Sequence, residues 1–323
     1  MPTVLKTDAA LVPFGEIERG LLAERGLELV ERPCGTEEEL VEHGRGVDAL
    51  MVVAEPVTAR VIEALAGLRV ITRFGAGLDN LDVEAATRAG VQVTYVPGAS
   101  VEEVSDHTIA MIFALARGLP VLDAAVRRGE WAIPGNVPPF RRMRGQTLGI
   151  VGVGRIGGAV ERKARALGLE TVAFDPYASG EALAALEVEP LPLDELLARA
   201  DHVSVHAPLT AETHHLIGAR ELALMKPTAT LVNVARGGLV DQAALAEALA
   251  AGRLRGAGVD VQEREPPPAD EPLLGLPNVI LTPHAAHFSQ ESMDDLRRSA
   301  IEDVAAVLDG RAPRFPVNET AAA

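Results

Sequence analysis

Residues 147–160 read TLGIVGVGRIGGAV, and this stretch decides the fold of the second half of the chain. Its apolar run Leu148–Val151 is typical of a buried strand, and Gly158–Leu167 has the pattern of a helix. Between them lies a GxGxxG turn made by Gly152, Gly154 and Gly157. The first glycine of such a turn permits the bend, the second lets the backbone approach a pyrophosphate, and the third lets helix and strand pack closely. Backbone N–H groups at the helix start then hold the phosphate.

An acidic residue follows at the spacing that this turn requires. Glu170–Phe174 predicts a second strand, and Asp175 ends it about 20 residues after the last glycine. A carboxylate at this place accepts hydrogen bonds from ribose hydroxyls and repels a 2′-phosphate. Because Pro176 and Tyr177 follow rather than an arginine, the sequence favours NAD over NADP as the cofactor.

Three later segments each place a charged residue just past an apolar strand. They are TLVNVARGG with Arg236, GVDVQEREP with Glu265, and VILTPHAAHF with His284. Ligands bind at the carboxyl ends of strands in open α/β sheets. An arginine there can hold a carboxylate in a bidentate fork, and a histidine can transfer a proton near neutral pH. Taken singly, the three could equally be a surface arginine, a solvated loop glutamate and a structural histidine.

Strands and helices alternate along most of the chain, which predicts parallel sheets covered on both faces. Strands are expected at 47–53, 68–73, 91–95 and 279–281, and helices at 58–65, 83–89 and 290–308. Val101–Arg117 predicts one long helix, apolar nearly all round and therefore buried, in a domain or subunit interface. Residues 118–145, with Pro120, Pro134, Pro138 and Pro139, are expected to be irregular. The tail Asn318–Ala323 is expected to be frayed.

Composition excludes several classes of partner. The formal net charge is −16 without a block of like charge, which argues against nucleic acid and against an anionic membrane surface. The single cysteine, Cys34, rules out an internal disulfide. No signal peptide or membrane-spanning run is visible, so we expect a cytoplasmic protein. The histidines at 202, 206, 214 and 215 lack ligand spacing and a carboxylate partner, so no metal site is predicted.

In this order the motifs resemble the D-isomer-specific 2-hydroxyacid dehydrogenase family, most closely its C-terminal-binding-protein-like branch. The matching stretches are RFGAGLDNLD at 73–82, VEEVSDH at 101–107, VGVGRIG at 151–157, HAPLT at 206–210, NVARGGLVD at 233–241, Asp260 through Glu265-Pro266, and TPHAA at 282–286. They cover nearly the whole chain.

The resemblance implies two doubly wound parallel-sheet domains. A Rossmann cofactor domain, residues 100–287, would be inserted into a flavodoxin-like substrate domain, residues 1–99 plus 288–323. The helix Val101–Arg117 would connect the domains and form part of a homodimer interface.

The resemblance also implies roles for single residues. Arg236 would bind the substrate carboxylate, His284 would exchange a proton with the substrate oxygen, and Glu265 would orient His284 and stabilise its protonated form. The loop of Gly75, Ala76 and Gly77 would bind the substrate with Arg236. The cofactor would contact Gly152, Gly154, Arg155, Ile156, Gly157, Asp175, His206, Pro208, Thr213, Val234, Ala235, Arg236, Asp260, His284 and Ala286.

The expected function is therefore D-stereospecific hydride transfer between NAD(H) and a small anionic 2-hydroxy or 2-keto acid. One alternative is an NAD(H)-responsive, corepressor-like binding protein with little catalysis. Others are phosphite or phosphoglycerate dehydrogenase activity. The intact set of Arg236, Glu265 and His284 favours an enzyme. His287 stands where the C-terminal-binding-protein branch often has an aromatic residue, so a more polar pocket is expected.

Overall fold

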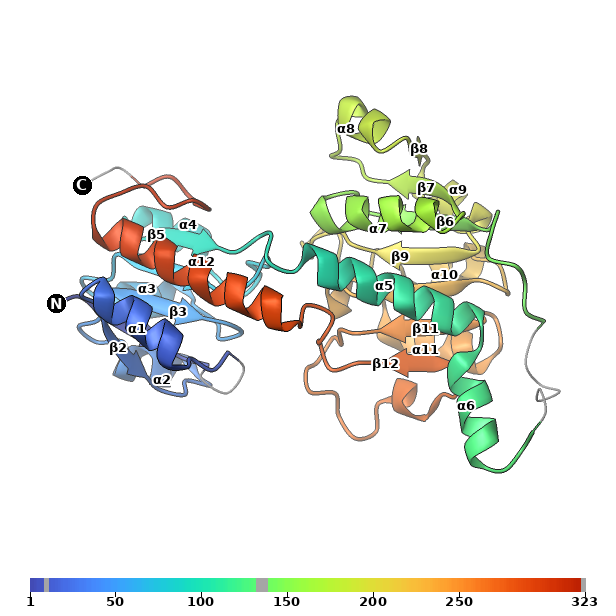
Figure 1. Ribbon diagram of the computed structural model, residues 1–323, viewed down its shortest axis with the longest axis horizontal. Coiled ribbons are helices and arrows are strands. Elements are labelled where there is room, and N and C mark those ends of the chain that lie inside the picture. The colour runs from blue at the N-terminus through green and yellow to red at the C-terminus, as the bar shows by residue number, and fades with distance from the viewer. Residues whose placement is uncertain (9–11, 132–138, 321–323) are drawn as a thin grey trace. The chain divides into compact units, whose positions relative to one another are not determined.

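The computed structural model describes residues 1–8, 12–131 and 139–320, and it divides into two compact units. Unit 1 comprises Met1–Ser100 and Ser289–Ala323, and unit 2 comprises Val101–Phe288. Each unit is built on one fully parallel sheet with helices on both faces (Figure 1). The predicted fold class, two doubly wound parallel-sheet domains, is confirmed.

The sheet of unit 1 has the strand order β2-β1-β3-β4-β5, the order of a flavodoxin-like fold. Its strands are β1 (Thr3–Lys6), β2 (Glu28–Glu31), β3 (Ala49–Val52), β4 (Val70–Arg73) and β5 (Gln92–Tyr95). The chain reverses its direction of travel across the sheet between β1 and β3. This switch point is the place where ligands bind in open sheets of this kind.

Two hydrophobic clusters cover the two faces of this sheet. Its helices are α1 (Glu16–Glu24), α2 (Glu37–His43), α3 (Ala59–Ala64), α4 (Val83–Arg88) and α12 (Gln290–Leu308). Successive residues of one strand point to opposite faces. Ala49 and Met51 therefore pack toward α1 and α12, whereas Leu50 and Val52 pack toward α2, α3 and α4. All four side chains are fully buried, as expected for a parallel sheet covered on both sides.

The sheet of unit 2 has seven strands in the order β12-β11-β10-β9-β6-β7-β8. They are β6 (Thr147–Val151), β7 (Glu170–Phe174), β8 (Glu189–Pro190), β9 (His202–Val205), β10 (Thr230–Asn233), β11 (Gly256–Val259) and β12 (Val279–Leu281). Six of them follow the Rossmann order, and β12 extends the sheet beyond β11. The switch point lies between β6 and β9, next to the glycine turn.

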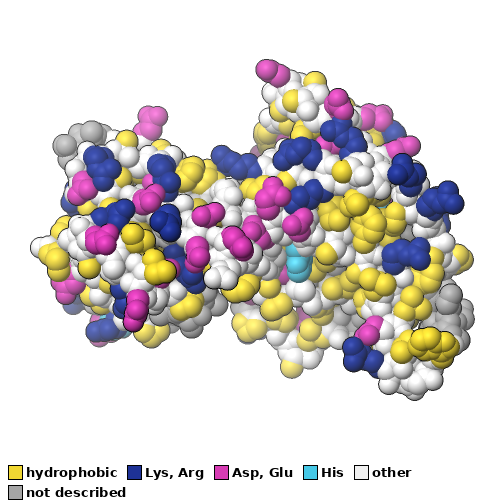
Figure 2. Space-filling view, viewed as in Figure 1, with side chains coloured by type: hydrophobic (Ala, Val, Ile, Leu, Met, Phe, Trp, Pro, Cys, Tyr) yellow, Lys and Arg dark blue, Asp and Glu magenta, His cyan; other side chains and the backbone are white. Residues whose placement is uncertain are grey.

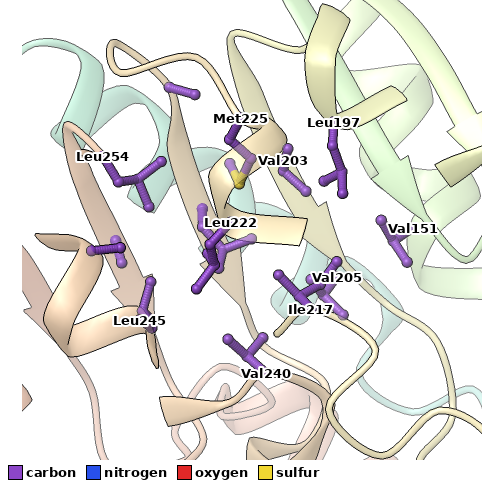
Figure 3. Close-up of a cluster of buried hydrophobic side chains, with 14 of the residues drawn as sticks. Val151, Leu197, Val203, Val205, Ile217, Leu222, Met225, Val240, Leu245 and Leu254 are labelled. Atoms are coloured by element: carbon purple, nitrogen blue, oxygen red, sulfur yellow. The ribbon is translucent and has the colours of Figure 1, made fainter. Parts of the chain in front are cut away.

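Helices cover this sheet in two groups (Figure 1). They are α5 (Val101–Ala116), α6 (Leu119–Arg127), α7 (Arg155–Ala166), α8 (Gly180–Ala185), α9 (Leu193–Arg199), α10 (Ala219–Leu224) and α11 (Gln242–Ala250), with short 3-10 turns η1 (Gly237–Leu239) and η2 (Pro272–Gly275). The group of α5 and α7 packs on one face. Figure 3 shows the cluster on the other face, where Leu222, Leu245 and Leu197 meet the strand valines Val203 and Val205.

Three local expectations from the sequence are wrong. Part of the segment expected to be irregular forms α6, because Pro120 lies in the first turn, where its missing N–H breaks no helical bond. Pro134 and Pro138 lie outside the described residues. Helix α7 begins at Arg155 rather than Gly158, so the last glycine of the turn lies inside the helix. Asn318 is not frayed, because its Oδ1 accepts the backbone N–H of Val93 at 2.7 Å.

Among the residues that the structure describes, no single helix is long and apolar enough to span a bilayer. Helices α5 and α6 meet the length and composition test only as a pair bent by 62°.

Candidate active site

The glycine turn of unit 2 is shaped by close approaches between backbone atoms. Gly152 has a φ of +93°, and a Cβ added there would lie 2.7 Å from the amide nitrogen of Ala207. A Cβ on Gly157 would lie 2.0 Å from the carbonyl oxygen of Gly152. A Cβ on Gly154, at the start of α7, would meet no atom within 4 Å. The first and third glycines therefore build the turn, and the second leaves its outer side open for a ligand.

Asp175 ties the end of β7 to this turn. Its Oδ2 accepts the N–H of Val153 at 2.9 Å, and its Oδ1 accepts the N–H groups of Tyr177 and Ala178 at 3.0 and 3.1 Å. A carboxylate has about four acceptor positions, so Asp175 keeps room for further donors. An acceptor fixed beside the phosphate turn fits the ribose of NAD and disfavours a 2′-phosphate.

His206 directly follows β9, and its backbone lies against Gly152 of the glycine turn. Both ring nitrogens are buried and have no hydrogen-bond partner among the described residues. Burial lowers the pKa of His206 to about 3, so the ring is neutral at pH 7. Buried polar atoms are normally satisfied, and the open ones here fit a site completed by a bound polar group. The following loop is held by Thr213, whose Oγ1 donates to the carbonyl of Pro208 at 2.7 Å.

The buried side chain of Asp260 organises the turn that carries His284. Its Oδ1 accepts the Thr282 hydroxyl at 2.5 Å and the Ala285 N–H at 2.9 Å, and its Oδ2 accepts the Ala286 N–H at 3.0 Å. The N–H of His284 donates to the carbonyl of Asp260 at 2.7 Å. Together these hydrogen bonds hold His284 at a φ of 54°, in the left-handed region. Asp260 thus fixes the backbone that presents the histidine.

His284 and Glu265 form a hydrogen-bonded pair. His284 Nδ1 lies 2.8 Å from Glu265 Oε2, and both side chains are partly exposed. The other oxygen, Oε1, accepts the N–H of Gln262 at 2.9 Å. Burial alone would raise the pKa of Glu265, but the bonds from His284 and Gln262 and the charge of Arg236 bring it below its ordinary value. Glu265 is therefore an anion at neutral pH. The ring of His287 lies edge-on to that of His284, with centroids 6.1 Å apart.

Arg236 lies on the loop after β10, next to the loop that carries Glu265. The side-chain amide of Asn233 holds this loop through two hydrogen bonds. It donates to the Arg236 carbonyl at 2.9 Å and accepts the Ala235 N–H at 3.1 Å. A Cβ on Gly237 would lie 2.0 Å from the carbonyl carbon of Gln262, so the two loops are pressed together. Since β10, β11 and β12 are neighbours, the structure brings Arg236, Glu265 and His284 to one edge of one sheet.

The remaining predicted cofactor residues lie around the same edge. Val234 and Ala286 are buried and pack in one cluster with Ile156. Arg155 is exposed as the first residue of α7, and Ala235 is half-buried after β10.

The predicted substrate loop belongs to unit 1. Gly75, Ala76 and Gly77 follow β4, and Gly75 has a φ of +117°. Its carbonyl accepts the N–H of Val96 at 3.0 Å, and the preceding Phe74 donates its N–H to Val52 at 2.9 Å. The loop is thus anchored to the ends of β3 and β5, and its role in substrate binding stays a prediction.

Sequence reasoning missed the residues that support the site. Asn233 and Gln262 hold loops, and His107 on α5 lies with Nε2 3.1 Å from the Thr282 hydroxyl. Asn233 and Thr282 stand inside the quoted motifs. The partners of Asn233 are its near neighbours Ala235 and Arg236, whereas Thr282 bonds to Asp260 and His107, which lie far along the chain. His107 ends the quoted stretch VEEVSDH, but that stretch does not show that its side chain meets Thr282.

Known proteins with similar sequences and structures have this architecture. The family model described as "D-isomer specific 2-hydroxyacid dehydrogenase, NAD binding domain" matches residues 109–286. A glyoxylate reductase of Korarchaeum cryptofilum is 41% identical over 285 residues, which cover 87% of this chain and 85% of that protein. A D-3-phosphoglycerate dehydrogenase of Methanocaldococcus jannaschii is 42% identical over 287 residues, but the match covers only 54% of its length.

A solved structure with bound cofactor gives the same result. The D-lactate dehydrogenase of Aquifex aeolicus, complexed with NAD and lactic acid, superposes with a TM-score of 0.85 at 28% identity. The alignment covers 95% of this chain and 96% of that one. From motif order, fold and these matches, the chain belongs to the D-isomer-specific 2-hydroxyacid dehydrogenases, NAD-dependent oxidoreductases of small 2-hydroxy and 2-keto acids.

Proposed function

We propose that this enzyme reduces glyoxylate and other short 2-keto acids, giving the D-isomer wherever the product is chiral. The observation that carries the proposal is the 2.8 Å pair of His284 and Glu265 at the sheet edge that also holds Arg236. Glyoxylate is placed first because it is named in relatives that match this chain over most of their own length.

Arg236 is assigned to the substrate carboxylate. A guanidinium keeps its charge at all working pH values and offers a planar fork of N–H donors to two carboxylate oxygens. Its Nη1 already donates to the carbonyl of Ala235 at 2.7 Å, which fixes one side of the fork. Its planar fork matches a carboxylate and can place the keto oxygen of the substrate toward the histidine.

His284 is assigned to the proton and Glu265 to the histidine. Because Nδ1 is bound to Glu265, Nε2 is the ring nitrogen that can give a proton to the keto oxygen. Bound NADH supplies the hydride that goes to C2 of the acid. The anionic Glu265 stabilises the charged imidazolium before the transfer and holds the ring in one tautomer. In the oxidative direction Nε2 takes the hydroxyl proton instead.

A second substrate is favoured by a separate observation. The phosphoglycerate dehydrogenase of M. jannaschii is as similar over the shared region as the glyoxylate reductase is. Oxidation of 3-phosphoglycerate is therefore the second candidate, although this chain spans about half the length of that relative. The comparisons do not favour the corepressor-like alternative. The assignment to the C-terminal-binding-protein-like branch and phosphite oxidation stay predictions.

The decisive experiment measures loss of NADH absorbance with glyoxylate, pyruvate and larger keto acids, and formation of NADH with 3-phosphoglycerate. NADPH and NADP are run in parallel. We expect glyoxylate with NADH to give the highest kcat/KM. His284→Ala and Arg236→Ala should cut turnover by about a hundredfold or more, since general acid catalysis alone contributes that much.

Binding of NADH, followed by its fluorescence, is the control for these variants, because neither should lose the cofactor. Near-parental turnover in both would refute the assigned roles. Activity only with 3-phosphoglycerate would select the second candidate.

We also propose that the working enzyme is a homodimer formed through α5 and α6. Figure 2 shows hydrophobic side chains gathered over the second half of α5 in unit 2. On and just after α6, Leu119, Val126 and Trp131 are 55, 49 and 89% exposed. Beside them is an apolar groove of about 500 Å³, lined among others by Leu115, Val121 and Leu254. Apolar surface of this kind marks an interaction site.

The cytoplasmic location, the absence of a metal site and the absence of nucleic-acid or membrane partners stay predictions from the sequence.

A further inference from the structure

Two carboxylates lie together at the switch point of unit 1. Asp8 follows β1 and Glu55 follows β3, and these strands are neighbours in the sheet. Thr7, between β1 and Asp8, donates both its N–H and its hydroxyl to the carbonyl of Met51, at 3.2 and 3.3 Å. The two strand ends are therefore fixed against each other, and the acids that follow them have little freedom to separate.

Glu55 is buried in this corner, with 5% of its surface exposed. Its Oε2 accepts the N–H groups of Val53 and Ala54 at 3.1 and 3.2 Å. The same Ala54 N–H lies 3.4 Å from Asp8 Oδ2, so one donor is shared by two carboxylates. The other oxygen, Oε1, is buried and has no hydrogen-bond partner among the described residues. An anion here is poorly compensated, because two backbone N–H groups, one of them shared with Asp8, face two carboxylates.

The neighbouring titratable groups are Lys6 and Cys34. Lys6 is fully buried and donates to the carbonyl of Asp8 at 3.2 Å, while its ammonium lies 3.9 Å from Glu31 and 4.9 Å from the centre of the Phe14 ring. Burial, followed by the charges of Glu55, Glu39 and Asp8, raises the pKa of the Cys34 thiol to about 11, which keeps it neutral. Burial lowers the pKa of Lys6 despite Glu31, Asp8 and Glu55, and Arg19 adds to this effect. Burial and the nearby Asp8 raise the pKa of Glu55 to about 7.

Hydrogen bonds connect the turn at 53–57 to the substrate loop of Gly75, Ala76 and Gly77. The carbonyl of Glu55 accepts the side-chain amide of Asn80 at 2.8 Å. Val57 donates its N–H to the carbonyl of Asn80 at 2.8 Å and accepts the N–H of Asp82 at 2.9 Å. Asn80 ends the loop that begins at Gly75, so the turn and the loop are bonded into one piece.

We propose that Asp8 and Glu55 share one proton, and that this proton makes Glu55 a positioning residue for the loop of Gly75, Ala76 and Gly77. While the proton is present, the acids hydrogen-bond and the turn at 53–57 is held. When it is lost, the buried anion of Glu55 and the half-buried anion of Asp8 repel each other, and the turn at 53–57 holds Asn80 less tightly. The effect on substrate affinity rests on the proposed function, whereas the shared proton does not.

The sign of the pH dependence follows from the raised pKa. Between the ordinary carboxyl pKa and about 7, the folded unit holds a proton that an unfolded chain has released. The stabilisation of the turn is therefore complete at acidic pH and is lost as the pH rises through that window. Above about pH 7 no further loss is expected from this pair.

The test compares the native protein with Glu55→Gln and Glu18→Gln between about pH 6 and about pH 8. Glu18 is the matched control, because it is buried in the same unit but faces Arg297, 3.7 Å away, rather than a second carboxylate. Hydrogen–deuterium exchange is read at residues 53–57 and 80–82, corrected for intrinsic exchange rates. KM and kcat for glyoxylate are measured on the same samples. Asp8→Asn removes the pair from its other side if Glu55→Gln does not fold.

In the native protein and in Glu18→Gln we expect protection to fall about tenfold across this range, the change that one pKa unit represents. KM should rise about fivefold, a typical coupling between two sites, with kcat little changed. In Glu55→Gln both dependences should disappear. His284 and Glu265 are unchanged in all three proteins, so the comparison isolates the acid pair.

An unchanged slope of protection in Glu55→Gln would overturn the shared proton. If Glu55→Gln removes the pH dependence of protection but leaves the pH dependence of KM unchanged, the positioning of the loop is overturned. If no keto acid is reduced at all, the proposed function fails, and the exchange data still decide whether the proton and the loop are coupled.

Discussion

Glu265 acts through its charge as well as its geometry, and a single substitution separates the two. Glu265→Gln keeps an acceptor for His284 Nδ1 but removes the anion that stabilises the imidazolium. A hydrogen bond to a charged group contributes about 1.5–3 kcal/mol, so kcat/KM should fall about tenfold to a hundredfold. Glu247→Gln, an exposed change on α11 in the same unit, is the control. Equal activity in the two variants would show that the charge of Glu265 is not used.

The pH dependence of this pair has the opposite sign to that of Glu55. Because the folded-state pKa of Glu265 lies below its ordinary value, its contribution is present above that ordinary value and is lost as pH falls through the folded one. A pH profile of kcat/KM should therefore show no inflection from Glu265 between about pH 5 and about pH 8. An acid limb in that range, present in the native enzyme and absent in Glu265→Gln, would contradict this.

At the scale of elements, two glycines of the turn between β6 and α7 have different roles, one in folding and one in cofactor binding. Gly157→Ala should destabilise unit 2, because its Cβ would lie 2.0 Å from the Gly152 carbonyl oxygen. Gly154→Ala should leave the melting temperature unchanged, since its Cβ meets nothing within 4 Å, yet it should weaken NADH binding about tenfold or more by blocking the approach of a pyrophosphate.

Gly180→Ala at the start of α8 is the control for both variants, because its Cβ also meets no atom within 4 Å. Calorimetry and NADH titration on the three variants give a direct comparison. If Gly154→Ala bound NADH normally, the cofactor would not lie along this turn.

Some elements could be predicted from the sequence because their signals are local. Helix α12 has the bounds expected from its pattern, since Ser289 caps its start and Gly310 follows its end. Strands β7 and β12 match for the same reason, as short apolar runs bounded by turn residues. Helix α6 was missed because its proline was interpreted as a helix breaker, although a proline in the first turn costs nothing.

The site could be predicted only in part, because its parts lie far apart along the chain. Arg236, Glu265 and His284 are visible as charged residues after strands, but no pattern shows that Gly237 packs on Gln262 or that Asp260 binds three donors of the 282–286 turn. The pair of Asp8 and Glu55 has no motif at all. It exists because β1 and β3 are neighbours, which the order of the chain does not reveal.

At the scale of the whole molecule, the assembly can be tested through the exposed face of α6. The apolar side chain of Val126 is 49% exposed, and on a dimer interface it would be buried against the second copy. A carboxylate there would have to be desolvated without a partner, which costs enough to break a modest interface. Sedimentation should therefore give twice the 34.0 kDa of the chain for the native protein and one chain for Val126→Asp. Ile17→Asp, at an exposed isoleucine on α1 of the other unit, should stay dimeric, because this change adds the same charge away from the proposed interface. A Val126→Asp variant that stays dimeric at micromolar concentration would move the interface away from α6, and a native protein of one chain would remove it.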